Sequence, residues 1–229
     1  MTTGDTCVGI VRNAQLILFD LDGTLTDPKI GITRAVQYAL AQYDIPVTDL
    51  DTLTPFIGPP LRQSFARYYG FDAQQSQAAV ASYREYFGEI GIFENVVYPG
   101  IPQLLERLSA DGRRLIIATS KPTVYAQRII EHFHINTYFT DVVGSNLDLT
   151  RSDKAEIIAH ILDTHPIVPR EAIVMIGDRE HDIIGARRNH LDAIGVTYGY
   201  GSLAELQSAG ASVIADSVDD LSNLLLERR

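Results

Sequence analysis

The sequence predicts an α/β protein with a doubly wound, Rossmann-like parallel sheet as its core and an inserted, all-helical cap domain. Along most of the chain, short apolar runs alternate with segments of helical spacing, which is typical of βαβ units in a parallel sheet. Residues 30–94 interrupt this alternation, because they contain helical patterns and no convincing strand. We therefore expect residues 12–27 and 96–229 to form the core and residues 28–95 to form the cap.

Each predicted strand is a short apolar run of the kind that a parallel sheet buries on both faces. The runs are LILF from Leu16, LIIAT from Leu115, AIVMI from Ala172, AIGV from Ala193 and a weaker VI at Val213. Helical spacing in the core covers residues 102–110, 122–133, 154–164, 180–189, 203–209 and 218–226. In the cap it predicts helices over residues 32–43, 61–69 and 76–89.

Proline and glycine mark both joints of the predicted cap. The cap begins after Pro28 and ends before Pro99-Gly100, and such joints are typical of a satellite domain that leaves a core and re-enters it. Six tyrosines at helical spacing lie in the cap, at positions 38, 43, 68, 69, 83 and 86. This stripe is compatible with a ligand cleft, but we expect it to pack between the cap helices.

Composition and charge exclude several classes of function. A net charge of -10 leaves no basic surface for a nucleic-acid polymer. No apolar run approaches the roughly twenty residues of a membrane-spanning helix, and the N-terminal stretch lacks the features of a signal peptide. A single cysteine, Cys7, excludes an internal disulfide framework. We expect a cytoplasmic protein without membrane contact, as a monomer or a homodimer, acting on small ligands.

Two acidic residues follow the first predicted strand. Ligands of an open parallel sheet bind at the carboxyl ends of its strands, and the first strand ends in Asp20-Leu21-Asp22-Gly23. The two carboxylates project to the same side of an extended segment, where they would repel each other. A hard cation such as Mg²⁺ resolves this conflict and can also hold a phosphate. Gly23 permits a tight turn away from the strand, and we also count it among the candidate phosphate-binding residues.

The later strands end in similar chemistry. Asp178 follows the third strand, and Asp182 lies four residues further on, where like charges on one helix face again favour a metal. For Asp182 the alternative is a capping role in the first helical turn. After the second strand, Thr119 offers a hydroxyl and Ser120 a backbone amide for phosphate oxygens. Thr119 is equally compatible with an ordinary β-branched strand residue.

Lys154 lies at the start of a predicted helix, where its charge opposes the helix dipole. Asp153 and Glu156 form a plausible capping box there. A residue that breaks a local rule is a candidate for function. We expect Lys154 to neutralise charge on a carboxylate nucleophile and on a transferring phosphoryl group.

Together, FDLDGTLTD from Phe19, IATSKP from Ile117, Lys154 and IGDREHD from Ile176 resemble the four ordered motifs of the haloacid dehalogenase superfamily. The resemblance covers the chain after about residue 14. It implies that Asp20 is a nucleophile that forms an aspartyl-phosphate, and that Asp22 protonates the leaving group and then activates water.

The same resemblance implies the remaining roles. Thr119 would bind phosphate and Lys154 would stabilise the intermediate. Asp20, the backbone carbonyl of Asp22 and Asp178 would hold Mg²⁺, with Asp182 as a ligand directly or through water. The helical insert resembles the first type of cap in the superfamily. True dehalogenases lack an aspartate at the position of Asp22 and need no metal, so this residue selects phosphoryl transfer.

The substrate is predicted less directly. IGPPL from Ile57, together with GARRNH and GVTYGYG near the C-terminus, resembles phosphoglycolate phosphatase-like and 5′-nucleotidase-like members. We favour a nucleoside 5′-monophosphate, with phosphoglycolate as the alternative. Gly58 and Arg62, at the start of a cap helix, are candidate substrate-binding residues, although a plain turn before a helix that begins near proline explains them equally well.

Three rival functions follow from parts of the pattern. Gly199-Tyr200-Gly201 superficially matches a dinucleotide fingerprint, but too little chain follows it for a second mononucleotide-binding half. A phospho-accepting signalling domain would also use an aspartate, Mg²⁺ and a lysine, but it needs neither a cap nor an acid at position 22. A sugar phosphomutase shares the nucleophile and differs in how its cap excludes water.

Overall fold

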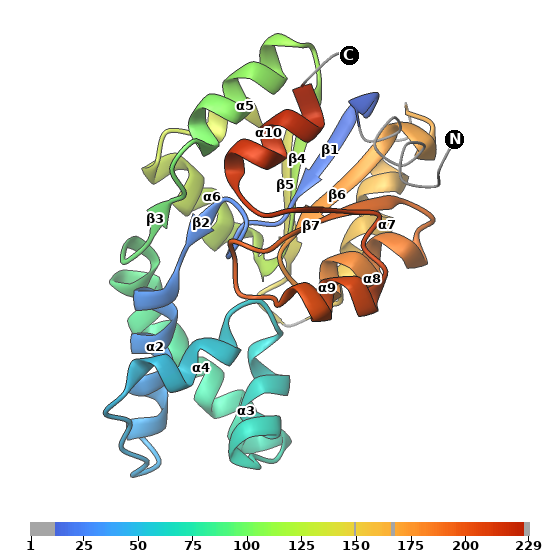
Figure 1. The fold of residues 1–229 in the computed structure, drawn as a ribbon. Helices are drawn as coiled ribbons and strands as arrows, with labels where there is room; N and C mark the ends of the chain where they lie inside the picture. The colour runs from blue at the N-terminus through green and yellow to red at the C-terminus, as the bar shows by residue number, and fades with distance from the viewer. Residues whose placement is uncertain (1–11, 149, 166–167, 227–229) are drawn as a thin grey trace.

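A six-stranded parallel sheet forms the centre of the computed structural model, which describes residues 12–148, 150–165 and 168–226 (Figure 1). The strand order is β5-β4-β1-β6-β7-β8. The strands are β1 (Leu16–Phe19), β4 (Arg114–Pro122), β5 (Asp141–Ser145), β6 (Ile173–Gly177), β7 (Asp192–Val196) and β8 (Val213–Ala215). Because β1 is central and the chain winds outward from it in both directions, the predicted doubly wound fold is confirmed. Cys7 lies outside the described residues.

Helices cover both faces of the sheet, and two separate apolar clusters attach them. Side chains alternate along a strand, so Ile17 and Phe19 face one cluster while Leu16 and Leu18 face the other. The first face is covered by α5 (Ile101–Ala110), α6 (Thr123–His132) and α10 (Val218–Leu226). The second is covered by α7 (Lys154–Thr164), α8 (Glu180–Arg188) and α9 (Leu203–Ala209). Two short 3-10 helices, η3 (Asn136–Tyr138) and η4 (Arg170–Ala172), precede β5 and β6.

Two features of the sheet were not predicted. The edge strand β5 was missed because its sequence DVVGS has only two apolar residues in a row, and its first two residues are only half-buried. Strand β4 extends to Pro122 instead of ending at Thr119, and its pairing with β5 shifts register between Ala118 and Pro122. This irregularity lies where the predicted phosphate-binding residues are found.

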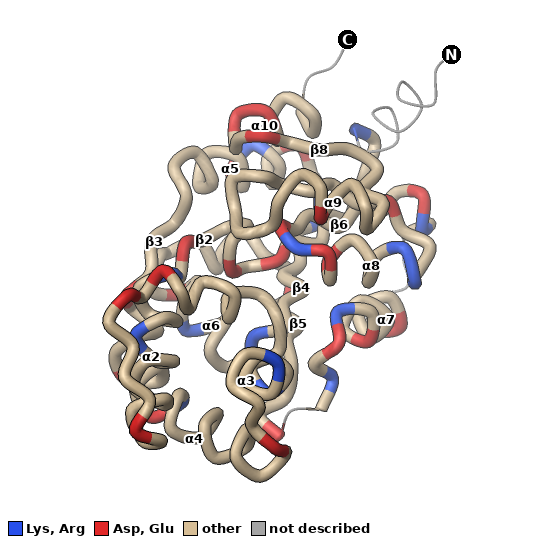
Figure 2. Tube along the Cα trace, turned by 60° about the horizontal axis from the view of Figure 1, so that its bottom comes forward, with Lys and Arg blue, Asp and Glu red and all other residues tan. Residues whose placement is uncertain are grey.

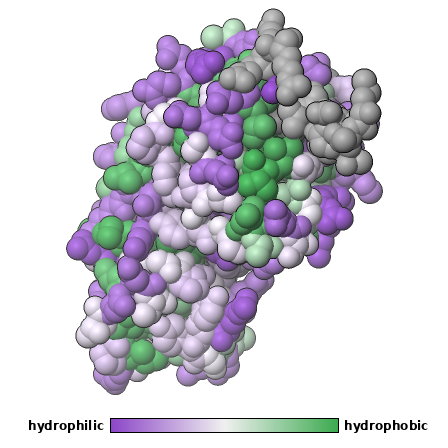
Figure 3. Space-filling model, in the orientation of Figure 1, coloured by the Kyte–Doolittle hydropathy of each residue, from purple (hydrophilic) through white to green (hydrophobic). Residues whose placement is uncertain are grey.

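The inserted helices form a smaller lobe below the sheet (Figures 1 and 3). They are α2 (Lys29–Ala41), η1 (Leu50–Phe56), α3 (Leu61–Tyr69), α4 (Ala73–Glu89) and η2 (Gly91–Phe93). The chain enters through β2 (Thr26–Asp27) and leaves through β3 (Val96–Val97), which pair antiparallel. Helix α2 begins earlier than predicted, at Lys29, whose amide donates a hydrogen bond to the carboxylate of Asp27 at 3.0 Å. The boundaries 28 and 95 stay a prediction.

Aromatic packing and one pair of glycines hold this lobe together. Tyr43 packs on Phe71 with ring centroids 4.6 Å apart, as the tyrosine stripe predicts. Where the lobe meets the linkers, a Cβ atom on Gly31 would lie 1.9 Å from the carbonyl oxygen of Gly91. Only glycine permits this approach of two backbones. Helix α2, where the chain enters the cap, is therefore packed tightly against η2, near where the chain leaves it.

In the view of Figure 2, lysine and arginine positions are interspersed with aspartate and glutamate positions along the Cα trace. Among the described residues, no helix has the length and apolar character needed to cross a membrane.

Candidate active site

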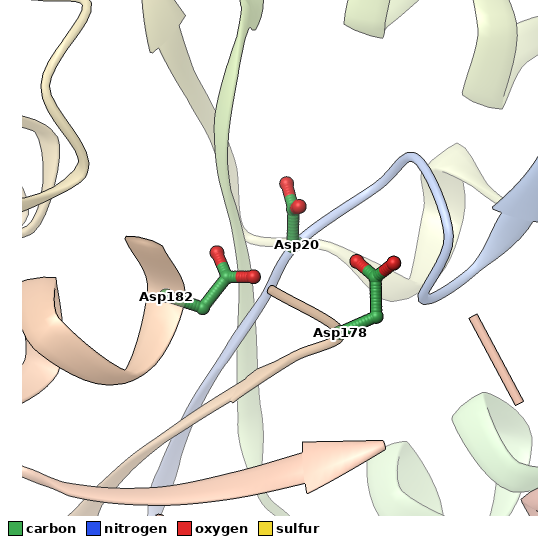
Figure 4. A group of neighbouring side chains, drawn as sticks. All are labelled: Asp20, Asp178 and Asp182. Atoms are coloured by element: carbon green, nitrogen blue, oxygen red, sulfur yellow. The ribbon is translucent and has the colours of Figure 1, made fainter. Parts of the chain in front are cut away.

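Three buried aspartates meet at the carboxyl edge of the sheet (Figure 4). Asp20 follows β1, Asp178 follows β6 and Asp182 lies in the first turn of α8. The residues are 5%, 0% and 1% exposed, and each offers a carboxylate oxygen within 4.8 Å of those of the other two. The chain thus brings together three of the predicted metal ligands.

The electrostatics of this group fit a cation. Burial raises the pKa of Asp178 well above its ordinary value, and the neighbouring charges of Asp182 and Asp20 add to the rise. Burial likewise raises the pKa of Asp182 to about 6, although Lys154 opposes the shift. Three buried carboxylates facing one lysine carry excess negative charge. Hard oxygen ligands in such a group suit Mg²⁺.

Lys154 is the cation of this cluster. Its Nζ lies 2.9 Å from Oδ1 of Asp20 and 2.7 Å from Oδ1 of Asp182, and it donates to the carbonyl oxygen of Ala118 at 2.7 Å. Burial by itself would lower the pKa of Lys154, but the two carboxylates raise it above its ordinary value. The ammonium is therefore charged and fixed between the nucleophile candidate and α8.

The helix start at Lys154 differs in one detail from the prediction. Asp153 caps α7, but its carboxylate accepts from the amide of Ala155 at 2.8 Å. Among the described contacts no reciprocal bond from Glu156 completes a capping box. The predicted capping box is therefore wrong, although Asp153 does cap the helix.

Gly185 restricts the packing around Lys154, since a Cβ on Gly185 would lie 2.9 Å from Cγ of Lys154.

Asp22 lies beside the triad but has a different partner. Its Oδ2 is 2.8 Å from Nζ of Lys121, and its buried Oδ1 has no hydrogen-bond partner among the described residues. Burial raises the pKa of Asp22, while Lys121 pulls it down and Asp20 pushes it up. One oxygen is thus held by an ion pair and the other is available to exchange a proton.

Lys121 was not among the predicted site residues. Besides its contact with Asp22, its ammonium lies 4.3 Å from the ring centroid of Phe87 in the cap helix α4. Two signals pointed to it: lysine occurs only three times in the chain, and this one follows Thr119-Ser120 directly. Lys121 connects the acid candidate Asp22 with the cap.

Glycines allow the chain to close around Asp178. Gly23 has φ of 85°, and a Cβ there would lie 2.2 Å from Oδ2 of Asp178. On the other side, the amide of Tyr200 donates to Oδ2 of Asp178 at 2.7 Å, and a Cβ on Gly199 would lie 2.4 Å from Cβ of Asp178. The Gly199-Tyr200-Gly201 segment, which resembles a dinucleotide fingerprint, thus packs on the acidic group.

The predicted phosphate-binding residues lie close by. Thr119 is 2% exposed, and its Oγ1 accepts from the amide of Lys121 at 3.3 Å. Ser120 lines a large cavity between core and cap. Their roles in binding phosphate stay predictions.

That cavity has a volume of about 520 Å³ and runs from Asp22 into the cap. Its walls include the aromatic side chains Phe56, Phe71, Tyr83, Phe87 and Tyr125. Gly58 and Arg62, the predicted substrate-binding residues, both line it as well. Tyr83, for which we favoured packing over a place in a ligand cleft, is 5% exposed and also forms part of the wall.

The fold and the site together define an α/β protein of Rossmann-like fold with a buried acidic group at the carboxyl edge of its parallel sheet. The family model described as "Haloacid dehalogenase-like hydrolase" matches residues 17–196, and the chain belongs to this family. The predicted resemblance is therefore confirmed, and so is the prediction that the chain is a phosphatase.

Named relatives cover most of the chain. A 5′-nucleotidase from Pseudomonas aeruginosa is 52% identical over 86% of this chain and 91% of its own length. Tyrosine-protein kinase PtkA from Mycobacterium tuberculosis is 36% identical over 93% of this chain and 73% of its own length. More distant relatives, at 26% to 28% identity, are named phosphoglycolate phosphatase.

Solved structures share the whole architecture. A predicted phosphatase from Clostridium acetobutylicum is 48% identical, with a TM-score of 0.89, and the match covers 92% of this chain and 97% of that chain.

Proposed function

We propose that the protein hydrolyses nucleoside 5′-monophosphates through an aspartyl-phosphate on Asp20. The observation that carries this substrate class is the cavity of about 520 Å³ with its aromatic walls next to Asp22. Aromatic faces suit stacking on a flat nucleobase, and the volume lies within the range of about 300–1,000 Å³ for small-molecule sites. The name of the 52% identical relative supports the same class.

In the first step, Asp20 attacks the phosphorus atom. Because Lys154 holds Oδ1 of Asp20 at 2.9 Å, we assign the attack to Oδ2. The bond from phosphorus to the nucleoside oxygen breaks, and Asp22 donates its proton to that oxygen. The raised pKa of the buried Asp22 favours the protonated state that this step needs.

In the second step, Asp22 accepts a proton from water. The resulting hydroxide attacks the phosphorus atom, the bond to Asp20 breaks, and phosphate leaves. Lys154 stays within contact of Asp20 throughout and offsets charge on the carboxylate. Thr119 and the amide of Ser120 are proposed to bind phosphate oxygens, while Gly58 and Arg62 contact the nucleoside.

We propose that Asp20, Asp178 and the carbonyl of Asp22 hold the Mg²⁺, which supplies positive charge to the transferring phosphoryl group. For Asp182 we favour a contact through water. Its Oδ1 is already 2.7 Å from Lys154, and its Oδ2 accepts from the amide of Arg179 at 3.1 Å.

Phosphate release with Mg²⁺ tests the proposal. The panel contains nucleoside 5′-monophosphates, phosphoglycolate, sugar phosphates and pyrophosphate. We expect the highest kcat/KM for a nucleoside 5′-monophosphate. A higher kcat/KM for phosphoglycolate would make phosphoglycolate the substrate instead. Formation of an isomerised sugar phosphate would indicate a mutase, and a stable phosphoprotein without phosphate release would indicate a signalling domain.

We propose a cytoplasmic location, where such nucleotides occur.

A further inference from the structure

Two arginines join the cap to the core through hydrogen bonds to backbone carbonyl oxygens. Nη1 of Arg179, in the core, donates to the carbonyl oxygen of Ile57 in the cap at 2.6 Å. Nη1 of Arg84, in the cap, donates to the carbonyl oxygen of Leu147 in the core at 2.8 Å. The chemistry proposed above uses neither bond. Of the two, Arg179 lies next to the metal-ligand candidates.

The side chain of Arg179 is held in place before it reaches the cap. Its Nε lies 2.9 Å from Oε1 of Glu205, which also accepts from the amide of Glu180 at 2.9 Å. The guanidinium group has several donors in a rigid plane, so it can serve two acceptors at once. With its side chain only 16% exposed, Arg179 presents a fixed donor to Ile57.

The cap segment that receives this donor fits closely around it. Gly58 has φ of 100°, and a Cβ atom there would lie 2.9 Å from Cγ of Arg179. The residues from Gly58 to Arg62 then form part of the cavity wall. A bond to the carbonyl of Ile57 therefore fixes the start of this wall relative to the sheet.

We propose that Arg179 is a positioning residue that places the segment from Ile57 to Arg62 over the active site, so that the leaving group is held in the cavity. The inference rests on the proposed function for the identity of that leaving group. Arg179 acts through the cap backbone and does not touch the reacting atoms. Its amide, which donates to Asp182, is independent of the side chain.

Arg179→Gln tests this role against Arg187→Gln. Arg187 is a matched control, because it lies in helix α8, which begins directly after Arg179, and also donates to a carbonyl oxygen, that of Ala209 at 2.8 Å, but within the core. Each enzyme is assayed with a nucleoside 5′-monophosphate and with acetyl phosphate, whose leaving group is too small to fill the cavity. Arg179→Lys serves as a second variant that keeps the charge.

For Arg179→Gln we expect KM for the nucleotide to rise about 10-fold, the typical effect of losing a hydrogen bond from a charged donor. Turnover of acetyl phosphate and the Mg²⁺ concentration for half-maximal activity stay within about twofold. Arg179→Lys should raise the nucleotide KM less. Arg187→Gln should leave the KM of both substrates unchanged.

An equal loss of activity on both substrates would overturn the inference and assign Arg179 to the metal site. A rise in the Mg²⁺ concentration for half-maximal activity that matches the rise in KM would do the same. Hydrogen exchange provides a readout that needs no substrate. The amides between Ile57 and Ser64 should exchange faster in Arg179→Gln than in Arg187→Gln, and equal rates would also overturn it. If the wild-type protein turns over acetyl phosphate but no nucleotide, the proposed function fails, while the exchange measurement still decides the role of Arg179.

Discussion

The ammonium of Lys121 lies 2.8 Å from Oδ2 of Asp22. This pair opposes the effect of burial on the pKa of Asp22, so Lys121→Met should raise that pKa further. In the variant, Asp22 therefore keeps the proton needed for the first step up to higher pH. At a given pH, less of Asp22 is in the carboxylate form that the second step needs. We expect the pH optimum of kcat to move upward and kcat at pH 7 to fall by roughly 10- to 100-fold. A pH–rate profile measures both.

Lys29→Met is the control, because Lys29 pairs with Asp51 on the surface of the cap instead. Its pH profile should match that of the wild type. An unshifted optimum in Lys121→Met would show that the ion pair with Asp22 does not tune the acid.

The two aspartates of the first motif should fail in different ways. Asp20→Asn removes the nucleophile, so we expect phosphate release to fall by at least about 10³-fold without a phosphoenzyme. Asp22→Asn keeps the proposed nucleophile but can neither protonate the leaving oxygen nor activate water, so both steps should slow and the phosphoenzyme that does form should persist. Quench-flow with radiolabelled substrate separates the two. Normal release by Asp20→Asn would contradict the proposed mechanism.

Sequence patterns predicted those parts of the fold whose signal is local. LILF at Leu16–Phe19 is fully buried, and a run of that kind has few alternatives to a central strand. The site residues Asp20 and Asp178 were found for the same reason, because each follows such a run directly. Strand β5 (Asp141–Ser145) escaped because an edge strand needs less apolar sequence.

Contacts between distant segments could not be predicted in this way. The hydrogen bond from Arg179 to Ile57 joins positions 122 residues apart. Nothing near Arg179 in the sequence specifies it, since it depends on how the cap is placed over the sheet. The same holds for the cation–π contact of Lys121 with Phe87, although the rarity of lysine gave an indirect signal.

Asp178→Asn should stabilise the metal-free protein at neutral pH. Burial raises the pKa of Asp178 in the folded state above the pKa it has in the unfolded chain. Ionised Asp178 therefore lowers the free energy of unfolding at pH values above the folded pKa. This loss disappears as the pH falls to the ordinary pKa of an aspartate. In EDTA at pH 7.5 we expect the variant to have the higher Tm, by a few degrees, since about 1 kcal/mol corresponds to about 2–4 °C at this size.

This gain should shrink at pH 4.5 and reverse when Mg²⁺ is added, because only the wild type gains binding energy. Thermal unfolding at both pH values, with EDTA or Mg²⁺, measures the effect. A variant that is less stable than the wild type in EDTA at pH 7.5 would refute the strain assigned to the three carboxylates.

Gly199→Ala should damage the proposed metal site without removing a candidate ligand. The new Cβ atom would lie 2.3 Å from the carbonyl oxygen of Gly23 and 2.4 Å from Cβ of Asp178, and these atoms cannot yield like the end of a flexible side chain. The displaced Asp178 should raise the Mg²⁺ concentration for half-maximal activity by about 10- to 100-fold, as changes in the surroundings of metal ligands commonly do. Gly88→Ala in α4 is the control, since its Cβ atom would meet nothing closer than 3.6 Å. Titration of activity with Mg²⁺ compares the two variants, and an equal Mg²⁺ requirement would show that the loop at Gly199 does not position Asp178.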